Sequence, residues 1–151
     1  MGWRVQMENR ALLNILESII DEVKTAILAT VDTEGRPSMR WVSPALVRGR
    51  AGALYMVTSA RSTKVQHLKS NPQVQWLFQT RALDRIITVD GRVNVVDNPS
   101  IRAEVLEVIG PRLRPFWKIN MEERDLLVLE TIIERATYYV PMKGVKEELI
   151  F

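Results

Sequence analysis

The residues best suited to chemistry lie in one short segment, residues 58–64, with the sequence Thr-Ser-Ala-Arg-Ser-Thr-Lys. We predict that a strand ends here and that a helix begins near Ser62 or Thr63. The first turn of a helix carries unpaired backbone N–H groups and the positive end of the helix dipole, so it suits a phosphate group. Ser62 and Thr63 add hydroxyl donors, and Lys64 adds a positive charge. The segment therefore predicts an anion-binding site.

Arg40, on a neighbouring predicted strand, is the second candidate for this site, because a guanidinium group can hold two oxygens of one anion. A capped surface helix is the simpler interpretation of residues 62–64, since Ser and Thr caps are common. The charge distribution favours the anion site: from Gly35 to Leu83 there is no Asp or Glu, but there are eight basic residues. The rest of the chain carries 13 basic and 18 acidic residues, a net charge of −5. Strands and turns that simply carry few carboxylates are the alternative explanation.

The other residue types exclude most other kinds of site. Without cysteine the chain forms no disulfide, thiolate nucleophile, zinc–cysteine site or iron–sulfur cluster. His67 is the only histidine, which excludes a histidine-based metal cluster, and we expect its ring to be solvated or half-buried. The sequence contains no Gly-x-x-x-x-Gly-Lys phosphate loop, Gly-x-Gly-x-x-Gly fingerprint or Gly-x-Ser-x-Gly elbow. We therefore predict no metal site and name no catalytic acid, base or nucleophile.

Length and composition describe an ordinary folded protein. The 151 residues have a formal net charge of +3, and 46% of them are hydrophobic. This balance predicts a single domain over residues 1–151. No apolar run approaches the ~20 residues of a membrane span, and the first ten residues lack the apolar region of a signal peptide. We expect a cytoplasmic protein with no membrane-spanning segment.

Hydrophobic periodicity predicts the elements that position these side chains. An apolar stripe predicts an opening helix over residues 7–24. We predict strands over residues 26–31, 38–47, 53–58, 74–78, 85–96, 126–133 and 136–140, and shorter helices over residues 63–69 and 100–110. Ser100 is the candidate N-cap of the last helix, and residues 111–119 are expected to be irregular. Short strands joined by turns favour a closed antiparallel barrel over about residues 26–140.

Several segments between Ala26 and Val96 resemble one known family in both order and spacing. They are Ser38–Pro44, Leu54–Ser59 with the following Ser62–Lys64, Val65–Pro72, and Arg85–Val93. Together they resemble the FMN-binding split barrels related to pyridoxamine 5′-phosphate oxidase, and especially the general stress protein branch. The resemblance implies a mainly β fold with some helix (α+β): a six-stranded antiparallel split β-barrel of Greek-key type, with flanking helices.

The resemblance also implies a homodimer with one FMN in each of two clefts between the subunits. The cofactor-binding candidates are then Arg40, Trp41, Val42, Val57, Thr58, Ser62, Thr63 and Lys64. In such proteins the residues corresponding to Arg40 and Lys64 bind the FMN phosphate, helped by hydroxyl groups at Ser62 and Thr63. This agrees with the anion site inferred from the residues alone.

The remaining candidates would contact the rest of the cofactor. By the same resemblance, the backbone from Arg40 through Trp41 to Val42 follows the edge of the isoalloxazine ring. Val57 and Thr58 lie near the ribityl chain and the phosphate.

The chain departs from pyridoxamine 5′-phosphate oxidases in two places. Residues 141–151 lack the arginine pair that binds the substrate phosphate in those enzymes. Ile86 stands where many members have a glutamine after the arginine of the fifth strand. We therefore expect an FMN-dependent reductase or oxidase of another substrate, with NAD(P)H or another small molecule as electron donor, rather than a vitamin B6 oxidase.

Two alternatives stay open. A deazaflavin-dependent reductase would need extra basic residues for a longer anionic tail, which Arg61 or Arg114 would supply. A non-enzymatic stress protein would bind a flavin or haem without turnover. Nucleic acid is not an expected partner, because the aromatic residues are not interleaved with basic ones. Trp117 lies in a basic and aromatic segment, and no family motif assigns it a contact with the flavin of a partner subunit.

Overall fold

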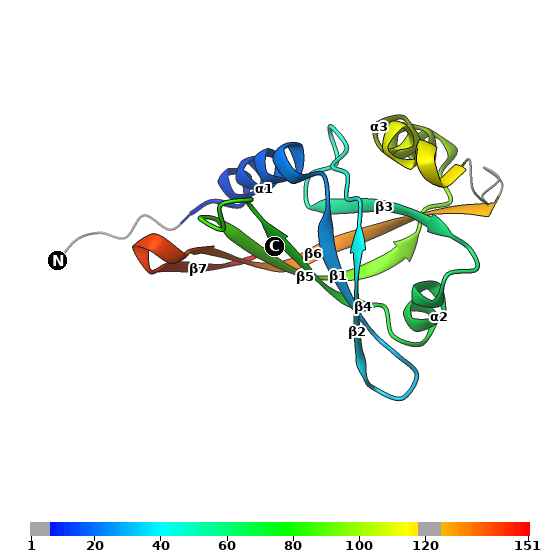
Figure 1. Cartoon of the computed structure of the whole chain (residues 1–151), viewed down its shortest axis with the longest axis horizontal. Helices are drawn as coiled ribbons and strands as arrows, with labels where there is room; N and C mark the ends of the chain where they lie inside the picture. Colours follow the sequence, from blue (N-terminus) through cyan, green and yellow to red (C-terminus); the bar gives the residue numbers. More distant parts are fainter. Residues whose placement is uncertain (1–6, 118–124) are drawn as a thin grey trace.

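The computed structural model describes residues 7–117 and 125–151, which form a largely antiparallel sheet with helices around it (Figure 1). The helices are α1 (Asn9–Val23), α2 (Thr63–Ser70) and α3 (Pro99–Trp117). The strands are β1 (Ala26–Val31), β2 (Pro37–Val42), β3 (Ala53–Ser59), β4 (Gln73–Gln79), β5 (Ile86–Val95), β6 (Leu126–Val140) and β7 (Val145–Ile150). A short 3₁₀-helix, η2 (Pro141–Lys143), joins β6 to β7.

The strand order confirms the predicted antiparallel fold class. The main path has six strands in the order β2-β1-β4-β5-β6-β3, and β7 pairs with β6 off this path. In the described residues no pairing between the end strands β2 and β3 closes this path, so the closed barrel favoured by the strand pattern was wrong. β1 and β2 form one hairpin and β4 and β5 another, while β3 crosses to the far end of the path beside β6. This crossing is the long connection that a Greek key requires. β7 is a seventh strand, in a region where the sequence pattern gave no clear prediction.

Alternation along the strands places the main core between the sheet and α1. Trp76 and Phe78 are fully buried on β4, and their rings stack 5.6 Å apart. The apolar stripe of α1 covers them with Leu12, Leu16 and Ile19, none of which is exposed. Burial of each such side chain contributes about 1.5–3 kcal/mol. The predicted strand over residues 74–78 is therefore confirmed, with Trp76 and Phe78 in the core.

Gly91 explains why the predicted fifth strand has a glycine at its centre. A Cβ atom at this position would lie only 2.5 Å from the carbonyl oxygen of Ile132 on β6. The register between β5 and β6 also shifts between Asp90 and Gly91, so that Glu134 is an extra residue on β6. The bulge lies at Glu134, and β6 continues through Glu134 and Arg135. The region is therefore one strand, although the sequence pattern predicts two strands that are separated by these residues.

The end of the second strand also differs from the prediction. The second strand ends at Val42 rather than Val47, because Pro44 has no N–H group for a ladder, and Ala45 forms only an isolated bridge with Tyr55.

The last helix begins and ends elsewhere than predicted. Asn98, not Ser100, caps α3: its Oδ1 accepts hydrogen bonds from the backbone N–H groups of Ser100 and Ile101. The helix then continues through Pro111 to Trp117, so the prediction of an irregular segment was wrong for residues 111–117. Val105 and Ile109 are fully buried against a second core cluster around β3, and this packing outweighs the unfavourable helix propensity of Gly and Pro. Residues 118–119 lie outside the described part.

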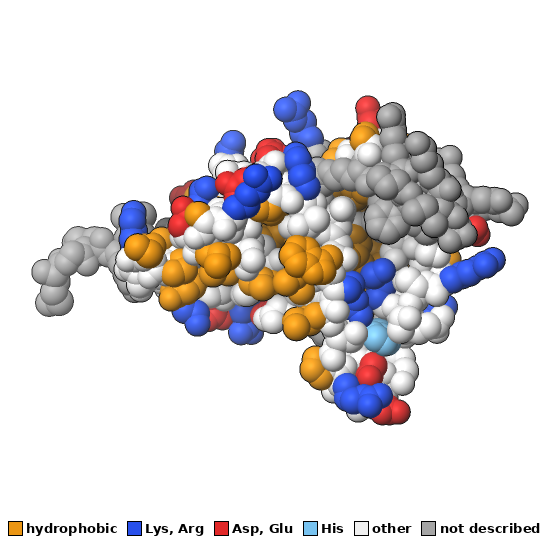
Figure 2. Space-filling model, in the orientation of Figure 1, with side chains coloured by type: hydrophobic (Ala, Val, Ile, Leu, Met, Phe, Trp, Pro, Cys, Tyr) orange, Lys and Arg blue, Asp and Glu red, His pale blue; other side chains and the backbone are white. Residues whose placement is uncertain are grey.

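Successive side chains of a strand point to opposite faces of the sheet, and those on the face opposite the main core form rows across the strands. One row crosses six strands through Trp41, Ile27, Leu77, Thr88, Thr137 and Glu148, and the next runs through Met39, Ala29, Gln75, Asp90, Arg135 and Ile150. Figure 2 shows apolar side chains in a band across the viewed face of the molecule, over β7 and towards β1 and β2. Trp41 and Met39 are each 72% exposed, and Ile150 is 67% exposed. We call these two rows the open face.

Candidate functional site

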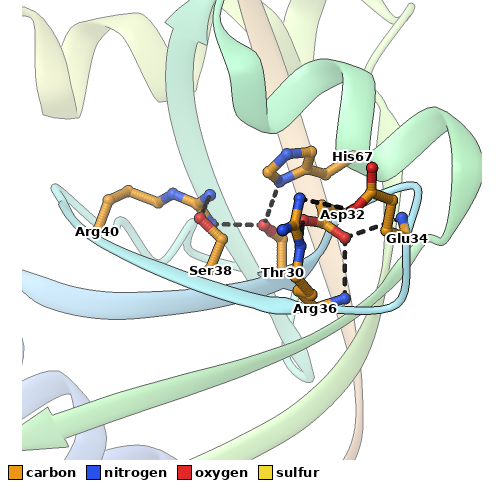
Figure 3. Close-up of polar contacts among 7 residues, drawn as sticks. All are labelled: Thr30, Asp32, Glu34, Arg36, Ser38, Arg40 and His67. Carbon is orange, nitrogen blue, oxygen red and sulfur yellow. Dashed lines mark hydrogen bonds and ion pairs between the residues drawn. The ribbon is translucent and has the colours of Figure 1, made fainter.

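Arg40 lies on β2, directly opposite Leu28 of β1, and its guanidinium group is held by neutral oxygens (Figure 3). Nη1 donates to the carbonyl oxygen of Leu28 at 3.2 Å and to Oγ1 of Thr30 at 2.7 Å. Nη2 donates to Oγ of Ser38 at 3.0 Å. Because none of these partners is a carboxylate, the positive charge of Arg40 is positioned but not neutralised.

These contacts leave one edge of the guanidinium group available. Arginine has five N–H donors, of which Nη1 carries two, Nη2 two and Nε one. Both donors of Nη1 and one donor of Nη2 have partners. Nε and one N–H of Nη2 have none among the described residues, and the Nε–Nη2 edge is one of the edges through which arginine binds an oxyanion in bidentate fashion. The arrangement can therefore accept two oxygens of one anion.

Lys64, in the first turn of α2, is the second cation of the site. Its Nζ donates to Oγ1 of Thr58 at 2.7 Å, and Thr58 in turn donates to Oγ of Ser62 at 3.2 Å. Burial of the ammonium group, with a smaller contribution from the positive charge of Arg40, lowers the pKa of Lys64. Arg40 and Lys64 are thus close enough to repel each other.

Between Gly35 and Leu83, Arg36 and Arg50 form ion pairs with carboxylates that lie outside this stretch. Arg36 pairs with Asp32 at 3.0 Å and with Glu34 at 2.8 Å, as Figure 3 shows. Arg50 pairs with Glu130 at 3.3 Å. In the part of the chain that the structure describes, no carboxylate forms an ion pair with either Arg40 or Lys64.

The start of α2 does not behave as a simple capped surface helix. Ser62 is the N-cap residue, but its side chain makes no capping hydrogen bond. Its oxygen instead accepts the bond from Thr58, and Thr63 is exposed. The first N–H groups of a helix have no intrahelical partner, so this end of α2 retains donors beside Lys64. These features support the anion-binding interpretation of the segment.

The structure brings some of the predicted site residues together and separates others. Arg40, Thr58, Ser62 and Lys64 form one group, connected by the hydrogen bonds and the electrostatic interaction described above. Val42 and Val57 are half-buried. Alternation along β2 turns the Trp41 side chain to the open face, away from Arg40.

Two residues adjoining this group were not predicted. Thr30 is buried and contacts both Arg40 and His67. His67 is 9% exposed, so our expectation of a solvated or half-buried ring was wrong. A signal for Thr30 does exist in the sequence, because it follows Ala26 and Leu28 on the buried side of β1, where a polar residue needs a partner.

The described cavities lie mainly on the open face rather than around the two cations. One of about 270 Å³ is lined by Ile27, Trp41, Leu77 and Arg81, among others. A wider one of about 710 Å³ lies over Ala29, Gln75 and Asp90. The side chains of Arg114 and Trp117 lie outside the described part. In the described residues no His, Asp and Glu cluster could hold a metal ion, and no helix is long and apolar enough to cross a membrane.

Comparison with known proteins adds independent information. A family model described as pyridoxamine 5′-phosphate oxidase matches residues 14–139. The chain is 33% identical over 129 residues to the pyridoxine/pyridoxamine 5′-phosphate oxidase of Dichelobacter nodosus, covering 82% of this chain and 59% of that protein. The same enzyme of Pseudomonas entomophila is 35% identical over 80 residues, covering 53% of this chain and 36% of that protein. The chain thus spans less than two thirds of the length of these curated relatives.

Solved structures share the fold at low sequence identity. A protein related to general stress protein 26 from Clostridium acetobutylicum has a TM-score of 0.73 at 15% identity, covering 96% of this chain and 97% of that one. An FMN binding protein related to pyridoxamine 5′-phosphate oxidase, from Nostoc punctiforme, has a TM-score of 0.62 at 12% identity, covering 100% and 97%. A heme binding protein from Mycobacterium smegmatis has a TM-score of 0.70 at 17% identity, covering 87% and 55%. At these identities the likeness establishes the fold alone.

Proposed function

The chain belongs to the pyridoxamine 5′-phosphate oxidase family, and from that premise we propose that it binds FMN with the phosphate held by Arg40 and Lys64. One observation carries the proposal: two partly buried cations lie close together with no carboxylate partner among the described residues. Their repulsion destabilises the ligand-free site, and a phosphate of charge about −1.5 to −2 would relieve it.

The residues present fit a phosphate monoester. The Nε–Nη2 edge of Arg40 would take two phosphate oxygens. Lys64 uses one of its three N–H donors on Thr58 and would give the others to the phosphate. The exposed hydroxyl of Thr63 and the first N–H groups of α2 would take the remaining oxygen.

The rest of the cofactor would extend from this phosphate along β2 and β3. The backbone of Trp41 and Val42 would lie against the edge of the ring, and Val57 and Thr58 would lie near the ribityl chain. These assignments rest on the resemblance of the segments to the family. When bound, the flavin would supply the electron chemistry of a reductase or oxidase, with NAD(P)H or another small molecule as donor.

The open face supports a homodimer as the functional form. Its exposed Trp41, Met39 and Ile150 lie on a sheet surface that no described helix covers. Exposed apolar side chains gathered on one face of a sheet are typical of an interface. β2 is the end strand of the path, with Arg40 on one side and Trp41 on the other. A second subunit on the open face would therefore border the flavin-binding cleft.

Ligand titration of the purified chain tests the proposal. Absorbance and fluorescence are recorded with FMN, riboflavin, a deazaflavin cofactor and haem added separately. We expect binding of FMN at micromolar concentration or below, and riboflavin to bind at least tenfold more weakly. No binding at micromolar FMN would refute the proposal. Reduction of bound FMN by NADPH would separate a reductase from a protein that only stores the flavin.

Haem is the second candidate, since a heme binding protein shares the fold. The chain has one histidine, and its Nδ1 atom lies 3.0 Å from the hydroxyl of Thr30. A buried ring with one nitrogen already engaged is a poor axial ligand. A Soret band on haem addition that persists in His67→Leu would show binding without that ligand.

A further inference from the structure

Arg40 is connected to α2 through a row of buried polar side chains (Figure 3). Oγ1 of Thr30 accepts a hydrogen bond from Nη1 of Arg40 at 2.7 Å and lies 3.0 Å from Nδ1 of His67. Thr30 is 1% exposed and His67 is 9% exposed, so water competes weakly for either bond. The row joins β2, β1 and α2, and the two cations of the phosphate site lie on β2 and α2.

The chemistry of the guanidinium group sets the direction of the first bond, and the tautomer of His67 sets the direction of the second. A guanidinium group only donates, so the Thr30 oxygen is the acceptor and its own proton remains available. The neutral ring of His67 accepts that proton at Nδ1 when its own hydrogen is on Nε2. The donors then run from Arg40 through Thr30 to His67, and in such a chain each bond polarises the next.

This direction matters because a hydroxyl group can rotate. With the Thr30 proton directed to His67, a lone pair of its oxygen faces Arg40. Without an acceptor at residue 67, the proton has no partner among the described residues, and the hydroxyl loses its fixed orientation. Nη1 would then keep only the carbonyl oxygen of Leu28 as a well-directed partner. The orientation of the free Nε–Nη2 edge of Arg40 depends on these contacts.

We infer that His67 is a positioning residue which, through Thr30, holds the Arg40 guanidinium with its free edge towards the phosphate. It thereby sets how strongly the site prefers a phosphate-bearing ligand over the same ligand without phosphate. This inference rests on the proposed FMN site and adds a residue that touches neither the ligand nor Arg40.

The test measures the ratio of the riboflavin Kd to the FMN Kd for the full chain and its variants. His67→Leu removes the acceptor, and Thr30→Val removes the hydroxyl at nearly constant volume. Each is expected to lower the ratio about tenfold, the effect of one hydrogen bond to a charged group. The double variant is expected to lose no more than either single variant, because both act through one path.

Conservative variants and a control separate positioning from general damage. His67→Asn can present its side-chain oxygen near the place of Nδ1, and Thr30→Ser retains the hydroxyl. Both are expected to restore the ratio to within about threefold of wild type. Gln66→Leu makes a comparable change on an exposed neighbouring position of α2 and is expected to leave the ratio unchanged.

The outcomes distinguish this inference from the proposed function. If wild type shows no preference for FMN, the proposed function fails. If Arg40→Ala removes the preference but folded His67→Leu keeps it, or loses FMN and riboflavin equally, only the role of His67 fails. Should His67→Leu not fold, the pair Thr30→Val and Thr30→Ser decides in the same way. Nitrogen-15 NMR of the wild-type ring at about pH 8 adds a test that needs no variant: a hydrogen on Nδ1 would overturn the inference.

Discussion

Replacing Lys64 by methionine should have two opposite effects, one on FMN affinity and one on the stability of the ligand-free chain. In the ligand-free site, burial and the charge of Arg40 both disfavour the ammonium group, as the lowered pKa of Lys64 indicates. Methionine retains most of the apolar stem and removes the charge. We therefore expect the Tm of the ligand-free variant to rise, although Thr58 loses one hydrogen-bond partner.

The effect on FMN follows from the donors that Lys64 has left. One or two charge-assisted hydrogen bonds to phosphate contribute about 1.5–3 kcal/mol. The variant should therefore bind FMN about 10- to 150-fold more weakly. Riboflavin lacks the phosphate, so its affinity should change less than about threefold.

The assays are fluorescence titration with both ligands and thermal unfolding without ligand. Lys69→Met is the matched control, since Lys69 is exposed in the last turn of the same helix. It should alter neither FMN affinity nor the Tm beyond experimental error. Equal weakening of FMN and riboflavin, or a fall in the Tm of Lys64→Met with FMN affinity unchanged, would refute the reasoning.

Three further predictions concern pH, the interface and the sheet. FMN affinity should fall as the pH rises through the lowered pKa of Lys64, below the ordinary lysine value of about 10.4, and this dependence should vanish in Lys64→Met. In the same range the ligand-free chain should become more stable to urea with rising pH, because the unfolded chain then binds more protons than the folded one. Trp41→Glu introduces a charge on the open face and should yield monomers with weakened FMN binding in sedimentation velocity and titration; dimers that bind FMN normally would contradict the proposed interface. Gly91→Ala should lower the free energy of unfolding in urea by about 1–3 kcal/mol, since its Cβ would lie 2.5 Å from the carbonyl oxygen of Ile132, and a loss under about 0.5 kcal/mol would show that β6 can move away.

The parts of the fold that depend on local periodicity could be predicted from the sequence. The apolar stripe of α1 and the alternation around Trp76 concern neighbours within one element, and both predictions were confirmed. The errors arose where contacts with a distant segment of the chain determine the bounds of a helix or strand. Residues 111–117 continue α3 because Val105 and Ile109 pack on β3, which outweighs a Gly-Pro pair. β6 continues past Glu134 because the register with β5 shifts at Gly91.

In the candidate site, too, features within one segment could be predicted, whereas contacts between distant segments could not. The donors of residues 58–64 lie in one segment, so their types and spacing indicate an anion site directly. His67 belongs to the same helix, but its partner Thr30 is 37 residues away, and nothing in a short helix with basic neighbours predicts a buried ring. The partners of Arg40 also lie on two different strands, and only the register of β1 with β2 places them together.

Phosphorus NMR of FMN bound to the wild-type chain tests the central claim most directly. The second pKa of a free phosphate monoester lies near 6, so its resonance shifts between about pH 5 and 8. Beside Arg40 and Lys64, with no opposing carboxylate among the described residues, the phosphate should remain dianionic. We predict that the bound resonance stays constant over this range and that titration returns in Arg40→Ala. A bound phosphate that titrates like free FMN in the wild-type protein would contradict the account.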